Sequence, residues 1–222
     1  LARASLPILI QGETGSGKEM IARRIHEQSG RRGPFRAVNC AALPRDLLEA
    51  ELFVIGRGVA TGVEARPGLL VSAAGGTLLL DEIGDLPHEL QPKLLRTLDS
   101  REVLAVGSHV PRSVDVRIVS ATHRDLDEAI GEGTFREDLF HRLAGAILRV
   151  PALRERPEDV LPIIRSILRE ARAAESEGPV AIDFEAARLL IGYEWPGNVR
   201  ELRNVIERAI ALCSDGVIGA SH

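Results

Sequence analysis

The chain has 222 residues, 45% of them hydrophobic and 27% charged, which is enough for one core or for one domain with a smaller satellite. Its formal net charge of -4 at pH 7 argues against nucleic-acid binding by this chain alone, which needs a basic face to displace counterions, so we expect DNA binding only through a domain outside this chain. No apolar run approaches membrane-spanning length and no signal peptide opens the sequence, so we expect no membrane contact.

The two cysteines, Cys40 and Cys213, are far apart and form no CxxC pair. Their spacing is typical of small buried residues in a reducing compartment, and we therefore expect a cytoplasmic protein without a cysteine metal site. Because the sequence starts with Leu1 just before a strand, we expect a fragment of a longer polypeptide.

Short apolar runs alternate with helical patterns along the first two thirds of the chain, which is typical of βαβ units and a largely parallel sheet. Helices are expected after Pro44 and from Pro87, because proline suits the first turn of a helix, where no intrahelical partner is lost. Pro92 falls early enough in its helix to be tolerated, with a bend. The expected strands are residues 8–10, 35–38, 77–80, 116–120 and 146–150.

The character of the sequence changes after Val150, where "PALRERPEDV" forms a proline-rich connection. Everything beyond it is expected to be helical, with helices near 157–174, 183–191 and 199–212. We therefore predict a domain boundary at about Pro151, which separates an α/β domain (1–150) from a small helical domain (151–222).

The stretch "ILIQGETGSGKE" takes a strand directly into a glycine-rich turn and then a helix. Gly12, Gly15 and Gly17 allow the backbone to curl so that successive N–H groups point at phosphate oxygens, and Lys18 would reach the β- and γ-phosphates. The pattern GxxxxGK[ST] is met except at its last position, where Glu19 replaces the hydroxyl residue. A glycine-rich turn that only caps a helix is the alternative.

The stretch "GGTLLLDEIGDL" is an apolar strand that ends in two carboxylates. In a P-loop ATPase, Asp81 would hold Mg²⁺ and Glu82 would polarise the attacking water. Taken alone, two acids at a strand end are usually solvated surface charges. Because the sheet topology would bring them to the same edge as the phosphate loop, the two motifs together predict nucleotide hydrolysis.

The sequence resembles the AAA+ ATPase domains of the sigma-54-dependent transcription activators over nearly its whole length. The resemblance rests on an ordered series of blocks: "LIQGETGSGKE", "FRAVNCAALPRDLLEAELF", "GGTLLLDEIGDLPHELQPKLLRTLDSREVLAVGS", "DVRIVSATHRDL", "FREDLFHRL", "PALRERPEDV" and "WPGNVRELRNVIERA". It implies a P-loop α/β/α three-layer domain with a parallel sheet, followed by a small all-helical lid. It further implies a homo-oligomeric ring, a hexamer, with ATP and Mg²⁺ between neighbours.

The family's phosphate loop also carries glutamate after the lysine, so the resemblance accounts for the glutamate at that position. It assigns ATP contact to the whole loop, namely Gly12, Glu13, Thr14, Gly15, Ser16, Gly17, Lys18 and Glu19. Asn39 corresponds to the switch residue that holds Glu82 away from its water; its alternative role is an amide that satisfies a strand end. Thr122 and His123 correspond to the sensor near the γ-phosphate, with the histidine a neutral hydrogen bonder or a titrating group.

Arg136 and Arg142 lie six residues apart in "FREDLFHRL", near one face of an expected helix. They resemble the arginine fingers that reach a neighbouring subunit's ATP, where a fixed charged fork neutralises developing charge. Surface ion pairs to Glu137 or Asp138 are the alternative. Arg200 resembles the second sensor, in contact with the nucleotide of its own subunit, whereas nearby Trp195 is expected to pack in the lid.

One block departs from the family. The loop that contacts sigma-54 has the family sequence GAFTGA, which corresponds here to Gly58, Val59, Ala60, Thr61, Gly62 and Val63. Alanine stands in place of the aromatic ring, and losing an aromatic anchor at a contact costs several kcal/mol. We therefore expect an active ATPase with weak or absent sigma-54 contact.

Three functions are consistent with the sequence. The first is an ATP-driven remodeller of sigma-54 RNA polymerase, and the second is a ring-forming ATPase of the same descent that acts as a sigma-54-independent regulator or scaffold. The third, a small-molecule kinase, leaves the paired arginines and the helical lid unexplained.

Overall fold

The computed structural model describes residues 2, 4, 6–53, 67–104, 111–174, 181–213 and 216–222. The chain divides into two compact units. The sheet unit comprises residues 1–11 and 18–149, and the helical unit comprises residues 12–17 and 150–222. The phosphate loop thus groups with the helical part of the chain, although the strand before it and the helix after it belong to the sheet unit.

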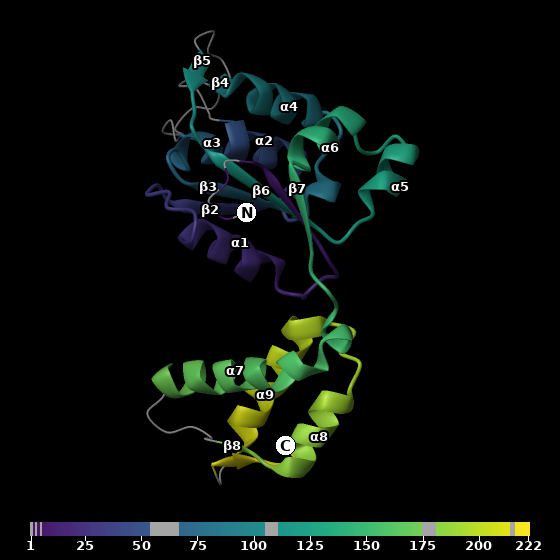
Figure 1. The fold of residues 1–222 in the computed structure, drawn as a ribbon. Coiled ribbons are helices and arrows are strands. Elements are labelled where there is room, and N and C mark those ends of the chain that lie inside the picture. The colour runs from purple at the N-terminus through teal and green to yellow at the C-terminus, as the bar shows by residue number, and fades with distance from the viewer. Residues whose placement is uncertain are drawn as a thin grey trace. The chain divides into compact units, whose positions relative to one another are not determined.

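The sheet unit is built on a five-stranded parallel sheet with the order β2-β3-β6-β1-β7 (Figure 1). All of the expected strands are present, with ends that differ from the prediction by no more than two residues. Central strands β3 and β6 are almost entirely buried, as the near-continuous apolar sequence of a strand covered on both faces requires. The strands are β1 (Ile8–Gln11), β2 (Phe35–Asn39), β3 (Thr77–Asp81), β6 (Arg117–Thr122) and β7 (Ala146–Arg149).

Helices cover both faces of this sheet and complete the three-layer α/β/α architecture predicted from the sequence. Helix α1 lies on one face, and α2, α3, α4 and α6 lie on the other (Figure 1). A 3-10 turn, η1 (Ile83–Asp85), follows β3 directly. The helices are α1 (Lys18–Glu27), α2 (Arg45–Phe53), α3 (Leu69–Ser72), α4 (Gln91–Ser100), α5 (Leu126–Gly131) and α6 (Glu137–Leu143).

Helix α4 begins four residues later than its predicted start at Pro87. The carbonyl of Pro87 accepts a turn hydrogen bond from the N–H of Leu90, so the preceding segment is a turn. Pro92 consequently occupies the first turn of α4, where its missing N–H breaks no helical hydrogen bond.

The antiparallel pair formed by β4 (Glu102–Leu104) and β5 (Pro111–Ser113) was not predicted from the sequence.

The core of the sheet unit lies between β3 and the helices of one face. Leu78 and Leu80 of β3 pack with Leu48 and Leu52 of α2 and with Leu94 of α4, and all five are completely buried. Burying a leucine side chain contributes roughly 1.5–3 kcal/mol. This core therefore fixes the position of β3, at whose carboxyl end the two acidic residues stand.

The helical unit has its own core around Trp195, which is 2% exposed and donates from Nε1 to the carbonyl of Leu190 at 2.8 Å. Val160, Ile164 and Ile167 form a buried stripe on α7 at helical spacing, which explains why this segment is a helix. The expectation that Trp195 packs in the lid is confirmed. The elements are η2 (Leu153–Glu155), η3 (Pro157–Asp159), α7 (Val160–Ala174), α8 (Phe184–Gly192) and α9 (Asn198–Leu212).

The predicted all-helical character of this unit needs one correction. Strands β8 (Ala181–Ile182) and β9 (Val217–Ile218) form a short parallel pair. Two-residue strands are too short to show an alternating pattern in the sequence. In the structure Ile218 of β9 is 2% exposed and belongs to the core of this unit.

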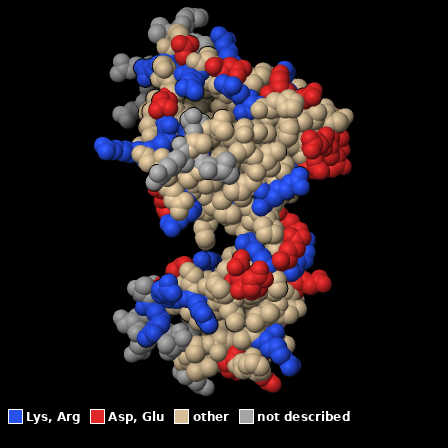
Figure 2. Space-filling model, viewed as in Figure 1, with Lys and Arg blue, Asp and Glu red and all other residues tan. Residues whose placement is uncertain are grey.

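Acidic and basic side chains both occur on each unit on the face seen in Figure 2, in keeping with the small net charge of the chain. Within the described parts of the chain, every helix is too short or too polar to cross a membrane.

Candidate functional site

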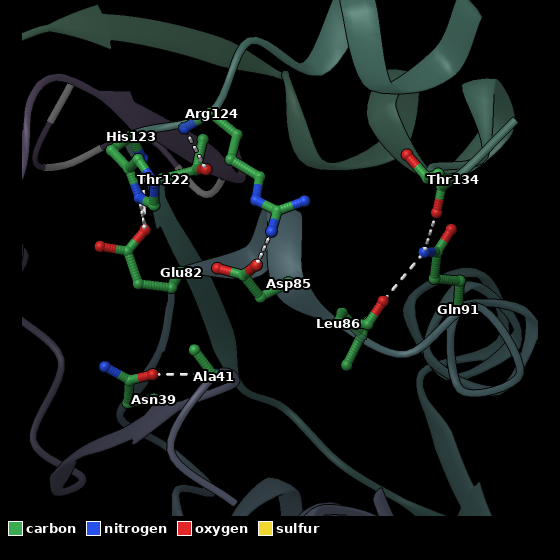
Figure 3. A network of polar contacts seen from close by, with 10 residues as sticks. All are labelled: Asn39, Ala41, Glu82, Asp85, Leu86, Gln91, Thr122, His123, Arg124 and Thr134. Carbon is green, nitrogen blue, oxygen red and sulfur yellow. Dashed lines mark hydrogen bonds and ion pairs between the residues drawn. The ribbon is translucent and has the colours of Figure 1, made fainter. Parts of the chain in front are cut away.

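Two acidic residues stand at the end of β3, and the backbone of the second is strained. Asp81 is the last residue of the strand, and Glu82, which follows it, has φ 50° and ψ 49°, the left-handed conformation. This conformation is rare for residues other than glycine and costs on the order of 1–3 kcal/mol, so it persists only where the surroundings impose it. It directs the side chain of Glu82 toward the end of the neighbouring strand β6, where His123 lies (Figure 3).

The Glu82 carboxylate is held from two sides. One oxygen, Oε2, contacts Nδ1 of His123 at 2.7 Å and accepts from the backbone N–H of His123 at 3.2 Å. The other, Oε1, lies 3.8 Å from Nζ of Lys18, the first residue of α1. Lys18 is 6% exposed and Glu82 is 14% exposed. The predicted lysine, acid and sensor residues therefore meet at one edge of the sheet.

Asp81 lies beside this pair, and its pKa is raised above the usual value by burial first and by the charge of Glu82 second. Two neighbouring carboxylates in a partly desolvated position favour a bound cation, because the cation offsets both penalties. The carboxyl oxygens also match the donors that Mg²⁺ prefers. The residues present thus fit the metal role predicted for Asp81.

Asn39 stands at the end of the adjacent strand β2. Its Oδ1 accepts from the backbone N–H of Ala41 at 2.8 Å, which is the strand-end role left open by the sequence (Figure 3). In this structure Glu82 contacts His123 and Lys18 instead of Asn39, so the switch role stays a prediction.

The last residue of β6, Thr122, is fully buried and organises the segment that carries His123. Its Oγ1 accepts from the backbone N–H of Arg124 at 3.0 Å. The side chain of Arg124 in turn pairs with Asp85 of η1, the turn that begins at Glu82 (Figure 3). Two side-chain pairs thereby join the sensor segment to the acidic turn, namely His123 with Glu82 and Arg124 with Asp85.

The phosphate loop, residues 12–17, requires glycine at two positions for different reasons. Gly15 has φ +77°, and a Cβ there would lie 2.4 Å from the carbonyl oxygen of Gly197. Gly17 has φ +101° with open space around it, so its requirement is purely conformational. Ser16 is 2% exposed, and its Oγ has no hydrogen-bond partner among the described residues. A buried hydroxyl without a partner is suited to an oxygen-rich ligand.

Glu13 of this loop is clamped by two residues that the sequence did not identify as part of a site. Arg154 donates to both of its carboxylate oxygens, at 2.8 and 2.5 Å, and Nδ2 of Asn198 donates to Oε2 at 3.0 Å. These contacts, that of Arg154 foremost, lower the pKa of Glu13 to about 2. Glu13 is therefore ionised and fixed at neutral pH, and it holds the loop on the start of α9.

Asn198 is the centre of this clamp. It is fully buried, has φ 54°, and its Nδ2 also donates to the carbonyl of Thr14 at 3.2 Å. Its Oδ1 accepts from the N–H of Leu153 at 2.7 Å. Asparagine tolerates the left-handed conformation better than most residues. That preference, within "WPGN", was the one sequence signal that could have identified it.

The loop backbone receives two further contacts from the helical unit. Arg156 donates to the carbonyl of Ser16 at 2.8 Å, and the backbone N–H of Arg200 donates to the carbonyl of Gly15 at 3.3 Å. Arg200, the predicted second sensor, thus lies in the first turn of α9 next to the loop. Glu19, by contrast, points away into an exposed ion pair with Arg23 at 3.1 Å.

The two predicted finger arginines are not on one face of a helix. Arg136 is the N-cap of α6, whereas Arg142 lies in the last turn of this helix. The backbone N–H of Arg136 donates to Oε1 of Gln91, a buried residue at the start of α4. Arg136 forms a two-point pair with Asp138 at 3.0 and 2.7 Å, one of the alternatives that the sequence left open. Arg142 pairs with Asp99 at 3.1 Å. Both pairs are exposed and contribute little to stability.

The predicted partner loop, residues 58–63, lies outside the described residues.

Comparison with known proteins identifies the family of the chain. Residues 1–149 match the family model of the sigma-54 interaction domain, and residues 154–222 match that of the AAA+ ATPase lid domain. The chain belongs to the sigma-54 interaction domain family. It is 48% identical to the sigma54-dependent transcriptional activator SfnR of Pseudomonas putida over 99% of this chain and 61% of that protein. It is 49% identical to the transcriptional regulatory protein GlrR of Escherichia coli over 98% of this chain and 50% of that protein.

Solved structures give the same assignment for the fold. NtrX from Brucella abortus superposes with a TM-score of 0.91 and 40% identity, covering 100% of this chain and 51% of that one. The same protein in complex with ATP gives a TM-score of 0.87. The chain spans less than two thirds of each of these relatives. The sigma-54 interaction domain is an AAA+ ATPase, and structures of NtrX with ADP and with ATP are among the similar ones.

Proposed function

We propose that this sigma-54 interaction domain hydrolyses ATP in a homo-oligomeric, hexameric ring and couples hydrolysis to the remodelling of an RNA polymerase holoenzyme. The observation that carries the proposal is the geometry of Glu82 beside Asp81. Its backbone is in the left-handed conformation, and its carboxylate is held between Lys18 and His123. This arrangement combines an acid that can polarise water with a lysine that can bind phosphate.

The phosphate loop would bind the nucleotide through its backbone N–H groups and through Lys18. The buried Oγ of Ser16 and the positive φ angles of Gly15 and Gly17 support this role. Asp81 would hold Mg²⁺ through water, and the bound ion would supply neutralisation of the phosphate charge. Arg200 would contact the nucleotide of its own subunit.

Glu82 would act as the base that orients the attacking water. Its contacts with Lys18 and His123 keep the carboxylate occupied in the structure described here. Phosphate oxygens that bind Lys18 would compete with its contact to Glu82 and release Oε1 of that carboxylate. His123, together with Thr122, would then face the γ-phosphate, and Asn39 would limit the approach of Glu82 to its water.

Arg136 and Arg142 would complete the site of a neighbouring subunit. Their guanidinium groups are exposed and paired with carboxylates that an incoming phosphate could replace at little cost. An arginine supplied to the transition state is worth on the order of 10³ or more in rate.

A subunit-mixing experiment tests the ring. Lys18→Ala subunits retain the arginine and lack a working site, whereas Arg136→Ala subunits retain the site and lack the arginine. Each alone should hydrolyse ATP poorly, and mixed rings should recover activity at interfaces that pair an intact loop with an intact arginine. No recovery at any ratio, with mixed rings shown to form, would contradict an arginine supplied by the neighbour.

Two observations bear on the macromolecular partner, namely family membership and the change in the loop that contacts sigma-54 in this family. Family membership supports sigma-54 holoenzyme as the target, and DNA would be bound through a domain outside this chain, in the cytoplasm where bacterial transcription takes place. The sequence GVATGV lacks the aromatic residue of GAFTGA, and this favours a second candidate, a sigma-54-independent regulator or scaffold of the same descent. Sigma-54 binding by the protein trapped with an ATP transition-state analogue separates the two.

A further inference from the structure

Gln91 is a buried glutamine at the start of α4 that binds three backbone groups of other segments. It is 0% exposed. Its Nε2 donates to the carbonyl of Leu86 at 3.0 Å and to that of Thr134 at 3.0 Å (Figure 3). Its Oε1 accepts from the backbone N–H of Arg136 at 2.8 Å. Both donors and the acceptor of the side-chain amide are therefore used.

On one side these bonds lead to the catalytic turn. Leu86 is the C-cap of η1. Its N–H donates to the carbonyl of Ile83 at 3.0 Å, and the N–H of Asp85 donates to the carbonyl of Glu82 at 2.9 Å. The hydrogen-bonded turn from Glu82 to Leu86 thus connects the backbone of Glu82 to Gln91. A shift of the turn at Glu82 would move the carbonyl that Gln91 holds.

On the other side the bonds lead to Arg136. The Gln91 contact is made to the backbone N–H of the arginine itself, and the contact with Thr134 holds the chain two residues earlier. Arg136 is the N-cap of α6, so its side chain leaves the helix at a point that Gln91 fixes. Because Gln91 and Arg136 are 45 positions apart in the sequence, this is a purely tertiary connection.

Burying an amide is worthwhile only when all of its hydrogen bonds are made, because each unpaired buried group costs about 1–3 kcal/mol. A leucine or methionine at this position would fill the space without that requirement. The fully bonded amide instead fixes three backbone groups relative to one another, which is the property that a positioning residue needs.

We propose that Gln91 is a positioning residue that fixes the position of Arg136 relative to the turn at Glu82. The state of one subunit's ATP site then determines where this subunit places the arginine that it offers to its neighbour. This proposal rests on the proposed role of Arg136 in the neighbouring site. The effect of Gln91 accordingly falls on the subunit that donates the arginine, and not on the subunit whose site hydrolyses ATP.

Mixed rings distinguish these two sides. Arg136→Ala subunits serve as recipients, since their own site is intact. Donors are Lys18→Ala subunits with or without Gln91→Met, a change that keeps a similar volume and removes all three hydrogen bonds. We expect the donor with Gln91→Met to restore ATP hydrolysis about tenfold to 10²-fold less than the Lys18→Ala donor, since a misplacement of about 1 Å can cost 10²-fold.

The reciprocal arrangement is the matched control. Gln91→Met introduced into the Arg136→Ala recipient should reduce rescue by the Lys18→Ala donor less than the same change in the donor does, because the donated arginine there is intact, and it should leave ATP-analogue binding unchanged. Gln91→Glu is the second variant. It keeps the acceptor for the Arg136 N–H and removes the donors to Leu86 and Thr134, and it should reduce donor rescue as well. Thermal melting and ring assembly are measured for every variant.

The outcomes separate this proposal from the one on which it rests. Equal rescue by the donors with and without Gln91→Met, or a loss confined to the recipient side, would overturn the positioning role and leave the neighbour-supplied arginine intact. Failure of the simple Lys18→Ala donor to rescue would instead overturn the neighbour-supplied arginine, and the positioning role with it.

Discussion

Replacing Asn198 with alanine removes the clamp between the phosphate loop and the start of α9. Three hydrogen bonds disappear, from Asn198 to Glu13, to the carbonyl of Thr14 and from the N–H of Leu153. The site is completely buried, so water cannot take the place of the amide without a rearrangement.

The magnitude follows from two terms. Leu153 is fully buried, and leaving its N–H without an acceptor costs about 1–3 kcal/mol. Alanine is also forced into the left-handed conformation at φ 54°, at a further cost of about 1 kcal/mol. The loss to Glu13 is small, because Arg154 still holds that exposed carboxylate. We therefore expect Asn198→Ala to lower the free energy of unfolding of the helical unit by about 2–4 kcal/mol.

Urea titration followed by tryptophan fluorescence measures this change. The chain contains one tryptophan, Trp195, which lies in the core of the helical unit, so the signal reports that unit selectively. Asn198→Gly is the matched control, because it loses the same hydrogen bonds but tolerates the positive φ, and it should be about 1 kcal/mol more stable than the alanine variant.

Two results would refute this reasoning. An Asn198→Ala protein within about 0.5 kcal/mol of the parent, the usual range for a neutral surface change, would show that the buried bonds are replaced. Equal stability of the alanine and glycine variants would show that the left-handed conformation carries no cost.

Three further predictions concern the ATP site and its partner. Lys18→Ala should abolish ATP binding, whereas Glu82→Gln should leave binding intact and stop hydrolysis, because the lysine holds ground-state phosphate and the glutamate acts on water; equal loss of binding in both would show that Glu82 is misassigned. The Glu13 carboxyl should titrate by NMR with a pKa of about 2, and Arg154→Ala should raise it toward the ordinary value of 4.5. Since folding lowers the pKa of Glu13, its contribution to the free energy of unfolding is complete above pH 4.5 and is lost as the pH falls toward about 2. A titration midpoint of Glu13 that is unchanged in Arg154→Ala would contradict the pairing. Ala60→Phe should give sigma-54 binding by the trapped protein that the natural loop lacks, and strong binding by the natural loop would overturn the predicted weak contact.

Features that depend on neighbouring residues could be predicted from the sequence. The apolar runs of β1, β3 and β6 indicated buried parallel strands, and the glycines of "GETGSGKE" indicated a loop with positive φ angles, which Gly15 and Gly17 have. The ordered motif blocks indicated the sigma-54 activator family, which the family match confirmed. Such features can be predicted without a structure, because residues a few positions apart determine strand periodicity and backbone conformation.

The contacts that organise the site join residues far apart in the sequence and could not be predicted from it. Glu82 and His123 are 41 residues apart, Gln91 and Arg136 are 45 apart, and Glu13 and Asn198 are 185 apart. Each pair depends on which strand ends and helix starts meet, and on which polar groups are left without a local partner once the core is packed. The left-handed conformation of Glu82 has the same origin, because packing of β3 and η1 imposes a backbone conformation that glutamate does not prefer by itself.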